Sequence, residues 1–122
     1  MRFAARAFTL AGIYGLVVLL PLYLLEDRLG RETPPPITHP EFFYGFAGVA
    51  IAWQLAFLVI GNDPVRHRPI MLPAIVEKLG YGVAVLVLFA SGRVAAPTLG
   101  TGLVDLALAA IFLAARARTP AE

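Results

Sequence analysis

The sequence contains no cysteine among its 122 residues. Without thiol groups the chain forms no disulfide, offers no thiolate nucleophile and holds no cysteine-ligated metal. This absence excludes quinone reductases of four-helix architecture that work through thiols.

Charged residues are also scarce, at 15% of the chain, whereas hydrophobic residues make up 59%. A water-soluble domain of this length cannot bury so much apolar surface. The apolar residues form four blocks, each near the roughly 20 residues that a helix needs to cross about 30 Å of hydrocarbon. These blocks are residues 7–25, 42–61, 70–92 and 94–115. We therefore predict an all-α, integral membrane, four-helix antiparallel bundle that forms a single domain over residues 1–122.

The first block has Arg2 and Arg6 before it, as a secretory signal would. It is longer, however, than the usual apolar region of about 7–15 residues in a signal peptide. The segment LYLLEDRLG that ends it is bulky and charged and offers no small-residue cleavage site. We predict that the block is retained as a transmembrane anchor.

The arginine distribution predicts how the helices are oriented in the membrane. The amino-terminal arm, the middle loop and the carboxyl tail carry two arginines each, whereas the two other loops carry two and one. Basic residues are retained on the cytoplasmic side of a membrane. We therefore predict a multi-pass protein of a bacterial cytoplasmic (inner) membrane, with both termini and the loop 62–69 facing the cytoplasm.

The connections contain signals for helix boundaries. The prolines at 34–36 favour an extended polyproline segment. Thr38 and Glu41 have the spacing of a capping box, which predicts that the second helix begins at Thr38. Asp63 before Pro64 predicts a short helical turn after that helix. The segment SGRVAAPTLG leaves only a tight link between the third and fourth helices.

The third block carries two adjacent charges, Glu77 and Lys78. Counted from Pro73 at about 1.5 Å per residue, Glu77 lies only about 6 Å along the helix, which predicts a position in the inner interfacial zone. The free N–H groups and the dipole of the first turns favour a carboxylate there. We expect Lys78 to extend to the lipid head groups. Because adjacent helical side chains point about 100° apart, we do not expect these two charges to pair.

Asp105 lies near the middle of the fourth block, where a charged side chain is costly unless it is neutral, paired or facing water. Its neighbours Thr101, Gly102 and Ala109 are small and lie on the same helix face. Small residues mark a face that packs against other helices. We therefore predict that Asp105 points into the bundle.

The second helix contributes Gln54 at the same level, and Gly48, Ala52 and Ala56 repeat small residues every four positions. We expect this repeat to allow close contact with another helix. The predicted polar core consists of Tyr14, Gln54, Tyr81 and Asp105, with Glu77 at its cytoplasmic mouth.

Two interpretations of this polar core stay open. The side chains can satisfy one another and fix the register of the helices. Alternatively they line a site for a ligand or for protons, in which a neutral Asp105 donates as well as accepts a hydrogen bond. Trp53 lies deep in the second helix, where its indole either packs or contacts such a ligand.

No other pattern indicates a catalytic or metal site. His39 and His67 are predicted on opposite sides of the membrane and cannot share a metal ion. Ser91 is the sole serine, and neither its helix nor the adjoining loop contains a histidine for a hydrolase triad. Nucleotide-binding and zinc-protease motifs are absent. We expect no cofactor, no metal and no nucleic-acid partner.

Residues 39–89, with their DPVRHRP loop, resemble small, uncharacterised bacterial four-helix membrane proteins, DoxX-like in architecture. AWQLAF followed by LPAIVEK is also similar to the EXPERA fold of sterol isomerases and sigma-2-receptor type proteins, in which a lipid-like ligand lies against acidic residues. Gln54 and the stretch 73–75 match that fold by position, but Ala50 replaces its acid and no histidine follows Ile75. The resemblance implies an architecture and a pocket, not isomerase chemistry.

Three functions follow as expectations. The first is a non-catalytic protein that binds a hydrophobic, lipid-like ligand or a membrane-protein partner, with Asp105, Gln54 and Glu77 as polar contacts. The second is a proton-coupled subunit of a small-solute transporter that uses Asp105 or Glu77 and forms a homo-oligomer. The third is an intramembrane isomerase-like enzyme, which requires an acid and a base that converge on one cavity.

Overall fold

A computed structural model describes residues 2–32 and 37–121 of the chain. These residues form five α-helices and two short 3₁₀ helices, and no strand occurs among them. The elements are α1 (Arg2–Leu19), η1 (Leu20–Leu24), α2 (Glu26–Glu32), α3 (Pro40–Asn62), η2 (Arg68–Ile70), α4 (Met71–Ala90) and α5 (Ala96–Arg118). The predicted all-α class is confirmed.

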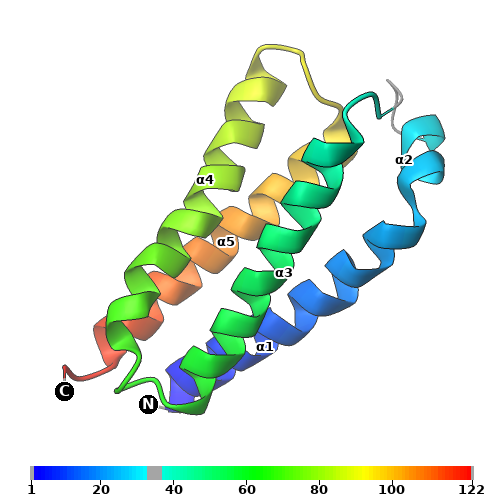
Figure 1. Ribbon diagram of the computed structural model, residues 1–122. Coiled ribbons are helices and arrows are strands. Elements are labelled where there is room, and N and C mark those ends of the chain that lie inside the picture. Colours follow the sequence, from blue (N-terminus) through cyan, green and yellow to red (C-terminus); the bar gives the residue numbers. More distant parts are fainter. Residues whose placement is uncertain (1, 33–36, 122) are drawn as a thin grey trace.

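Four segments of the described chain are long and apolar enough to cross a membrane. Each is 23 residues long, and they are Arg2–Leu24, Pro40–Asn62, Arg68–Ala90 and Ala96–Arg118. The chain is therefore a small multi-pass membrane protein. The start of α1 and the end of α5 lie at the same end of the bundle, because consecutive long helices run antiparallel (Figure 1).

The short helix α2 is an element that the sequence did not predict. Its seven residues, EDRLGRE, are too few to show an apolar period. They nevertheless suit a helix, because acidic residues occupy the first turn and Arg31 the last turn. Arg28 Nε also donates a hydrogen bond to Glu32 Oε1 at 2.9 Å, one turn along. The polyproline segment predicted at 34–36 lies outside the described residues.

The capping box predicted at the start of α3 is wrong. His39, not Thr38, is the N-cap, and no side chain caps the helix. Pro40 explains the shift, because a proline disfavours helical dihedral angles in the residue before it. His39 accordingly has φ −126° and ψ 75°, and its carbonyl oxygen accepts the first N–H group, from Phe42, at 3.0 Å.

The turn predicted after α3 is confirmed. Asp63 Oδ1 accepts a hydrogen bond from the N–H of Arg66 at 3.4 Å, and the Asp63 carbonyl oxygen accepts one from the N–H of His67 at 3.1 Å. This is the arrangement of an N-cap with proline at the first helical position. The turn leads directly into η2 and α4.

Helix α4 is terminated by a glycine, and the link to α5 is short, as predicted. Gly92 has φ +75°, and its N–H donates to the Phe89 carbonyl oxygen at 3.0 Å. The next N–H, from Arg93, donates to the Leu88 carbonyl oxygen at 2.8 Å. This pair of bonds is the Schellman motif, which requires a left-handed residue that glycine adopts at low cost.

The long helices pack as two pairs, α1 with α3 and α4 with α5. In the first pair, glycines of α1 let the helices approach closely. A Cβ atom at Gly12 would lie 2.8 Å from the carbonyl oxygen of Gln54, and a Cβ at Gly15 would overlap the Gln54 side chain. On the other side of the contact, a Cβ at Gly61 of α3 would overlap Thr9 Oγ1.

The small-residue repeat predicted to mediate this contact is on the wrong face of α3. Gly48 and Ala52 are exposed, and Ala56 is half-buried. Gln54 lies two residues from Ala52, or about 200° around the helix, so the two cannot both face inward. The inward face of α3 instead consists of Ala47, Ala50, Gln54, Phe57, Ile60 and Gly61.

In the second pair, α4 and α5 also meet at glycines. A Cβ atom at Gly82 would lie 2.7 Å from Leu106 Cδ2, and one at Gly102 would lie 2.6 Å from Val85 Cγ1. Gly102 and Ala109 are both buried. The face of α5 predicted to point inward is therefore buried at Gly102 and Ala109, whereas Thr101, which was predicted on the same face, is exposed.

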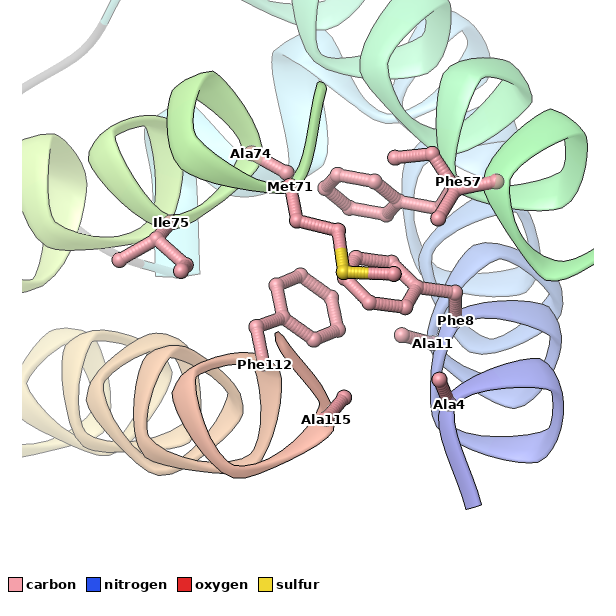
Figure 2. Packing of buried hydrophobic residues seen from close by; sticks show 10 residues of the cluster. Ala4, Phe8, Ala11, Phe57, Met71, Ala74, Ile75, Phe112 and Ala115 are labelled. Carbon is pink, nitrogen blue, oxygen red and sulfur yellow. The ribbon is translucent and has the colours of Figure 1, made fainter. Parts of the chain in front are cut away.

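A buried aromatic cluster joins the two pairs at the end of the bundle where the chain begins and ends (Figure 2). The Phe8 and Phe112 rings stack with centroids 4.1 Å apart. Phe57 packs at a steep angle against both rings, with its centroid 6.1 Å from Phe8 and 5.0 Å from Phe112. Met71 of α4 points toward these rings, so all four long helices contribute to this closed end.

Candidate functional site

Beyond this cluster, the two helix pairs enclose a partly open cavity of about 630 Å³. It begins near the middle of the bundle and extends toward the end that carries α2 and the α4–α5 link. Its apolar wall includes Val18, Leu19, Leu22, Leu29, Ile37, Phe43, Phe46, Ala50 and Val104. Five of the six predicted site residues also line it, namely Tyr14, Gln54, Glu77, Tyr81 and Asp105.

A charged cluster lies at the inner end of the cavity, formed by Glu77, Lys78 and Asp105. Lys78 Nζ is 3.7 Å from Glu77 Oε2 and 3.6 Å from Asp105 Oδ1. The lysine side chain is only 7% exposed, and the two carboxylate side chains are 19% and 18% exposed. Lys78 Nζ also lies over the Phe57 ring, 5.2 Å from its centroid. One cation therefore serves two carboxylates in an apolar surrounding.

Lys78 was expected to extend to the lipid head groups and not to pair with Glu77. Both expectations are wrong, because its ammonium is buried and lies 3.7 Å from Glu77 Oε2. Lys78 is buried on the same α4 face as Ala74, Ile75 and Gly82. The spacing of the sequence already indicated this position. Ala74 and Ile75 precede Lys78 by four and three positions and Gly82 follows it by four, so all of them lie on one face of the helix.

Glu77 also lies nearer the middle of its candidate span than predicted. The span that contains it begins at Arg68, because η2 precedes α4, so Glu77 and Lys78 are the tenth and eleventh of its 23 residues. The predicted position of Glu77 was counted from Pro73, five residues after the span begins at Arg68. Glu77 does not form the mouth of the cavity either, since the Phe8–Phe57–Phe112 cluster closes the bundle on that side.

Gln54 lies at the same inner end of the cavity and is 1% exposed. Its Nε2 donates to the carbonyl oxygen of Ala50 at 2.9 Å. Its Oε1 is buried and has no hydrogen-bond partner among the described residues. An unpaired buried amide oxygen costs about 1–3 kcal/mol, so this atom is an acceptor that a ligand can satisfy.

The two tyrosines of the predicted polar core have different positions. The Tyr81 hydroxyl shares a hydrogen bond of 2.8 Å with Thr101 Oγ1, and its ring stacks on Phe46 at 5.8 Å between centroids. Tyr81 therefore connects α4, α5 and α3 beside the cavity. Tyr14 lies at the cavity rim and is 49% exposed.

Trp53 does not line the cavity. It packs against the buried core and lies 6.3 Å from Phe57 between ring centroids. This geometry favours the packing role over the ligand contact. His39 and His67 belong to opposite ends of α3 and its following turn, and residues 2–32 and 37–121 contain no group of three His, Asp or Glu side chains suited to a metal ion.

The outer part of the cavity is bordered by the segment from η1 to α2. Leu22, Leu29 and Ile37 contribute to its wall. The Tyr44 hydroxyl of α3 donates a 2.8 Å hydrogen bond to Glu26 Oε1 at the start of α2. This bond attaches α2 to the bundle above the cavity.

No protein family model, curated protein or solved structure matches this chain. The resemblance to DoxX-like and EXPERA-like proteins therefore stays a prediction. The function has to be argued from the geometry of the site.

Proposed function

We propose that this membrane protein binds an amphipathic, lipid-like ligand in the cavity between its two helix pairs. The observation behind the proposal is the combination of an apolar wall with a polar inner end. A volume of about 630 Å³ lies within the range of about 300–1,000 Å³ that is usual for small-molecule sites. The ligand's apolar part would lie along the wall, and its head group would reach Gln54 and the charged cluster.

Native mass spectrometry of the purified protein with lipids, isoprenoids and sterol-like compounds tests this proposal. Val104→Trp fills the cavity and is expected to abolish saturable binding. Val87→Trp is the matched control, because Val87 is exposed on α4 and does not line the cavity. Binding that is unaffected by Val104→Trp, or no saturable binding by the wild type, contradicts the proposal.

The alternative function is a proton-coupled subunit of a transporter, in which the protein works as a homo-oligomer. Two carboxylates that share one ammonium near the middle of a span favour it, because intramembrane acids often carry protons. Transport by proteoliposomes would then depend on a pH gradient and would be lost in Asp105→Asn. Solute flux that is independent of pH contradicts this alternative.

For the orientation, we propose a cytoplasmic membrane with both termini on the cytoplasmic side, on the basis of the arginine distribution. The chain lacks cysteine, so single cysteines can be labelled without background. A membrane-impermeant maleimide added to intact cells is expected to label Ser91→Cys, in the α4–α5 link, and to leave Ala121→Cys unlabelled until the membrane is opened. The reverse pattern contradicts the orientation.

A further inference from the structure

The charged cluster is not electrically balanced. Lys78 supplies one positive charge against the two carboxylates of Glu77 and Asp105, so the ionised cluster has one negative charge in excess. Lys78 and both carboxylates line the cavity, and the only other ionisable side chains of the described residues that line it are Tyr14 and Tyr81. An uncompensated charge inside a membrane bundle is unfavourable. The cavity therefore favours an occupant that brings positive charge to its inner end.

The hydrogen-bonding groups at this end of the cavity also favour an occupant that donates hydrogen bonds. Gln54 Oε1 is a buried acceptor without a hydrogen-bond partner among the described residues, and Glu77 Oε2 accepts no hydrogen bond there although it faces Lys78 Nζ at 3.7 Å. The donors nearby are already used, since Gln54 Nε2 bonds to Ala50 and Lys78 Nζ lies between two carboxylates and the Phe57 ring. A ligand head group that donates hydrogen bonds therefore suits this end of the cavity better than one that only accepts them.

We propose that the head group of the ligand is a protonated amine, attached to a single apolar chain. This inference rests on the proposed ligand-binding function. The ammonium would lie beside the Glu77 and Asp105 carboxylates, in the cavity that Gln54 also lines, where it donates hydrogen bonds and balances the excess charge. The chain extends past Phe46 and Val104 toward α2.

Other head groups fit the cluster less well. A carboxylate or phosphate would add negative charge where an excess already exists, and would find only Lys78 as a cation, which two carboxylates already occupy. A hydroxyl can donate to Gln54 Oε1 but leaves the charge uncompensated. A proton taken up by one of the carboxylates is the competing way to balance the cluster, and then an amine would have no advantage over a hydroxyl.

Dodecylamine, dodecanol and dodecanoate form a matched set of probes, since they differ only in the head group. We would measure their binding to the full chain in nanodiscs of zwitterionic lipid, with empty nanodiscs and the Val104→Trp protein as controls for partition into the bilayer. The expected result is saturable binding of dodecylamine about tenfold or more tighter than dodecanol, with dodecanoate weakest.

Asp105→Asn and Glu77→Gln remove one carboxylate charge each and change little in shape. Each is expected to reduce the preference for amine over alcohol severalfold, because each removes a negative charge that only the amine balances. Two variants are used because either one alone can lower the stability of the bundle.

The outcomes separate the two proposals. Equal affinity for amine and alcohol, or a preference that both charge variants retain, overturns the amine assignment and leaves lipid-like ligand binding in place. Binding of dodecanoate as tight as that of dodecylamine has the same effect. If none of the three probes binds saturably and the wild type matches the Val104→Trp control for every lipid class, both proposals are wrong.

Discussion

At the scale of single residues, Lys78 is the position where one side chain holds two others in place. Lys78→Met would keep the length of the side chain and leave Glu77 and Asp105 without a cation in a largely buried site. Removing one partner of a buried ion pair typically costs about 3–5 kcal/mol, and we expect about 3 kcal/mol here because both carboxylates are partly exposed. Thermal unfolding in detergent measures the loss.

The same measurement on Lys78→Met combined with Asp105→Asn and Glu77→Gln gives the matched control. With both acids made neutral, most of the lost stability should return, because no buried charge is left unpaired. If Lys78→Met alone is as stable as the wild type, the ammonium does not stabilise the carboxylates.

Gly15 is a second residue with a specific structural requirement. A Cβ atom there would overlap Oε1 and Cδ of Gln54. Gly15→Ala should therefore displace the Gln54 side chain, break its bond to Ala50 and destabilise the protein by about 1–3 kcal/mol, the usual cost of overpacking. Thermal unfolding tests this, and Gly15→Ala combined with Gln54→Ala should recover part of the loss.

Gly80→Ala is the control for the helix effect of the same substitution. A Cβ at Gly80 would have no atom within 4 Å. In a helix interior, alanine is favoured over glycine by about 0.5–1 kcal/mol, so Gly80→Ala should be neutral or stabilising. Equal effects at Gly15 and Gly80 would show that the α1–α3 contact tolerates a methyl group.

At the scale of helices, the sequence predicts the long elements well and the short one not at all. The four spans follow from apolar runs near 20 residues, a signal that depends on length alone. Helix α2 has seven residues and is held by contacts such as the Tyr44–Glu26 hydrogen bond, which link residues 18 positions apart. A local sequence pattern does not contain such contacts.

Tyr44→Phe tests how α2 is attached to the bundle. The variant removes the 2.8 Å hydrogen bond to Glu26 and keeps the ring that stacks on Tyr23 at 5.6 Å between centroids. A single hydrogen bond contributes about 0.5–1.5 kcal/mol, so we expect little change in global unfolding but faster amide hydrogen exchange in Glu26–Glu32. Tyr23→Phe, which keeps the bond, should leave the exchange of α2 unchanged. Equal exchange in Tyr44→Phe and the wild type would show that other contacts fix α2.

At the scale of the whole molecule, two properties decide which of the predicted residues line one site. They are the position of a residue along its span and the direction in which its side chain faces around the helix. Asp105 and Gln54 line the same cavity because both lie near the middle of their spans and face inward. Lys78 was assigned to the interface because its depth depends on where the span begins, and η2 adds a turn that the prolines obscured. Gly48 was assigned to the wrong face because a repeat of small residues does not by itself show which face of a helix is buried. Ligand binding at the cavity stays a prediction.

The two ends of the bundle differ in packing, because the aromatic cluster fills one end and the cavity opens toward the other. Phe112 is fully buried and touches Phe8 and Phe57 in the cluster that joins the two helix pairs. Phe46 lies in the cavity wall, is 46% exposed and, among residues 2–32 and 37–121, stacks on Tyr81 alone. In lipid the loss on truncation is mainly one of packing, because the hydrophobic effect does not act between helices there.

We expect Phe112→Ala to lower the free energy of unfolding by at least about 2 kcal/mol, which is less than the roughly 3–5 kcal/mol that buried phenylalanines cost in water-soluble proteins. Phe46→Ala should cost less than about 1 kcal/mol, because half of its surface has no packing partner to lose. Unfolding of both variants in the same detergent compares them directly. A similar loss in both would mean that the cavity wall is packed as tightly as the aromatic cluster. That result would leave no room for a ligand between the helix pairs.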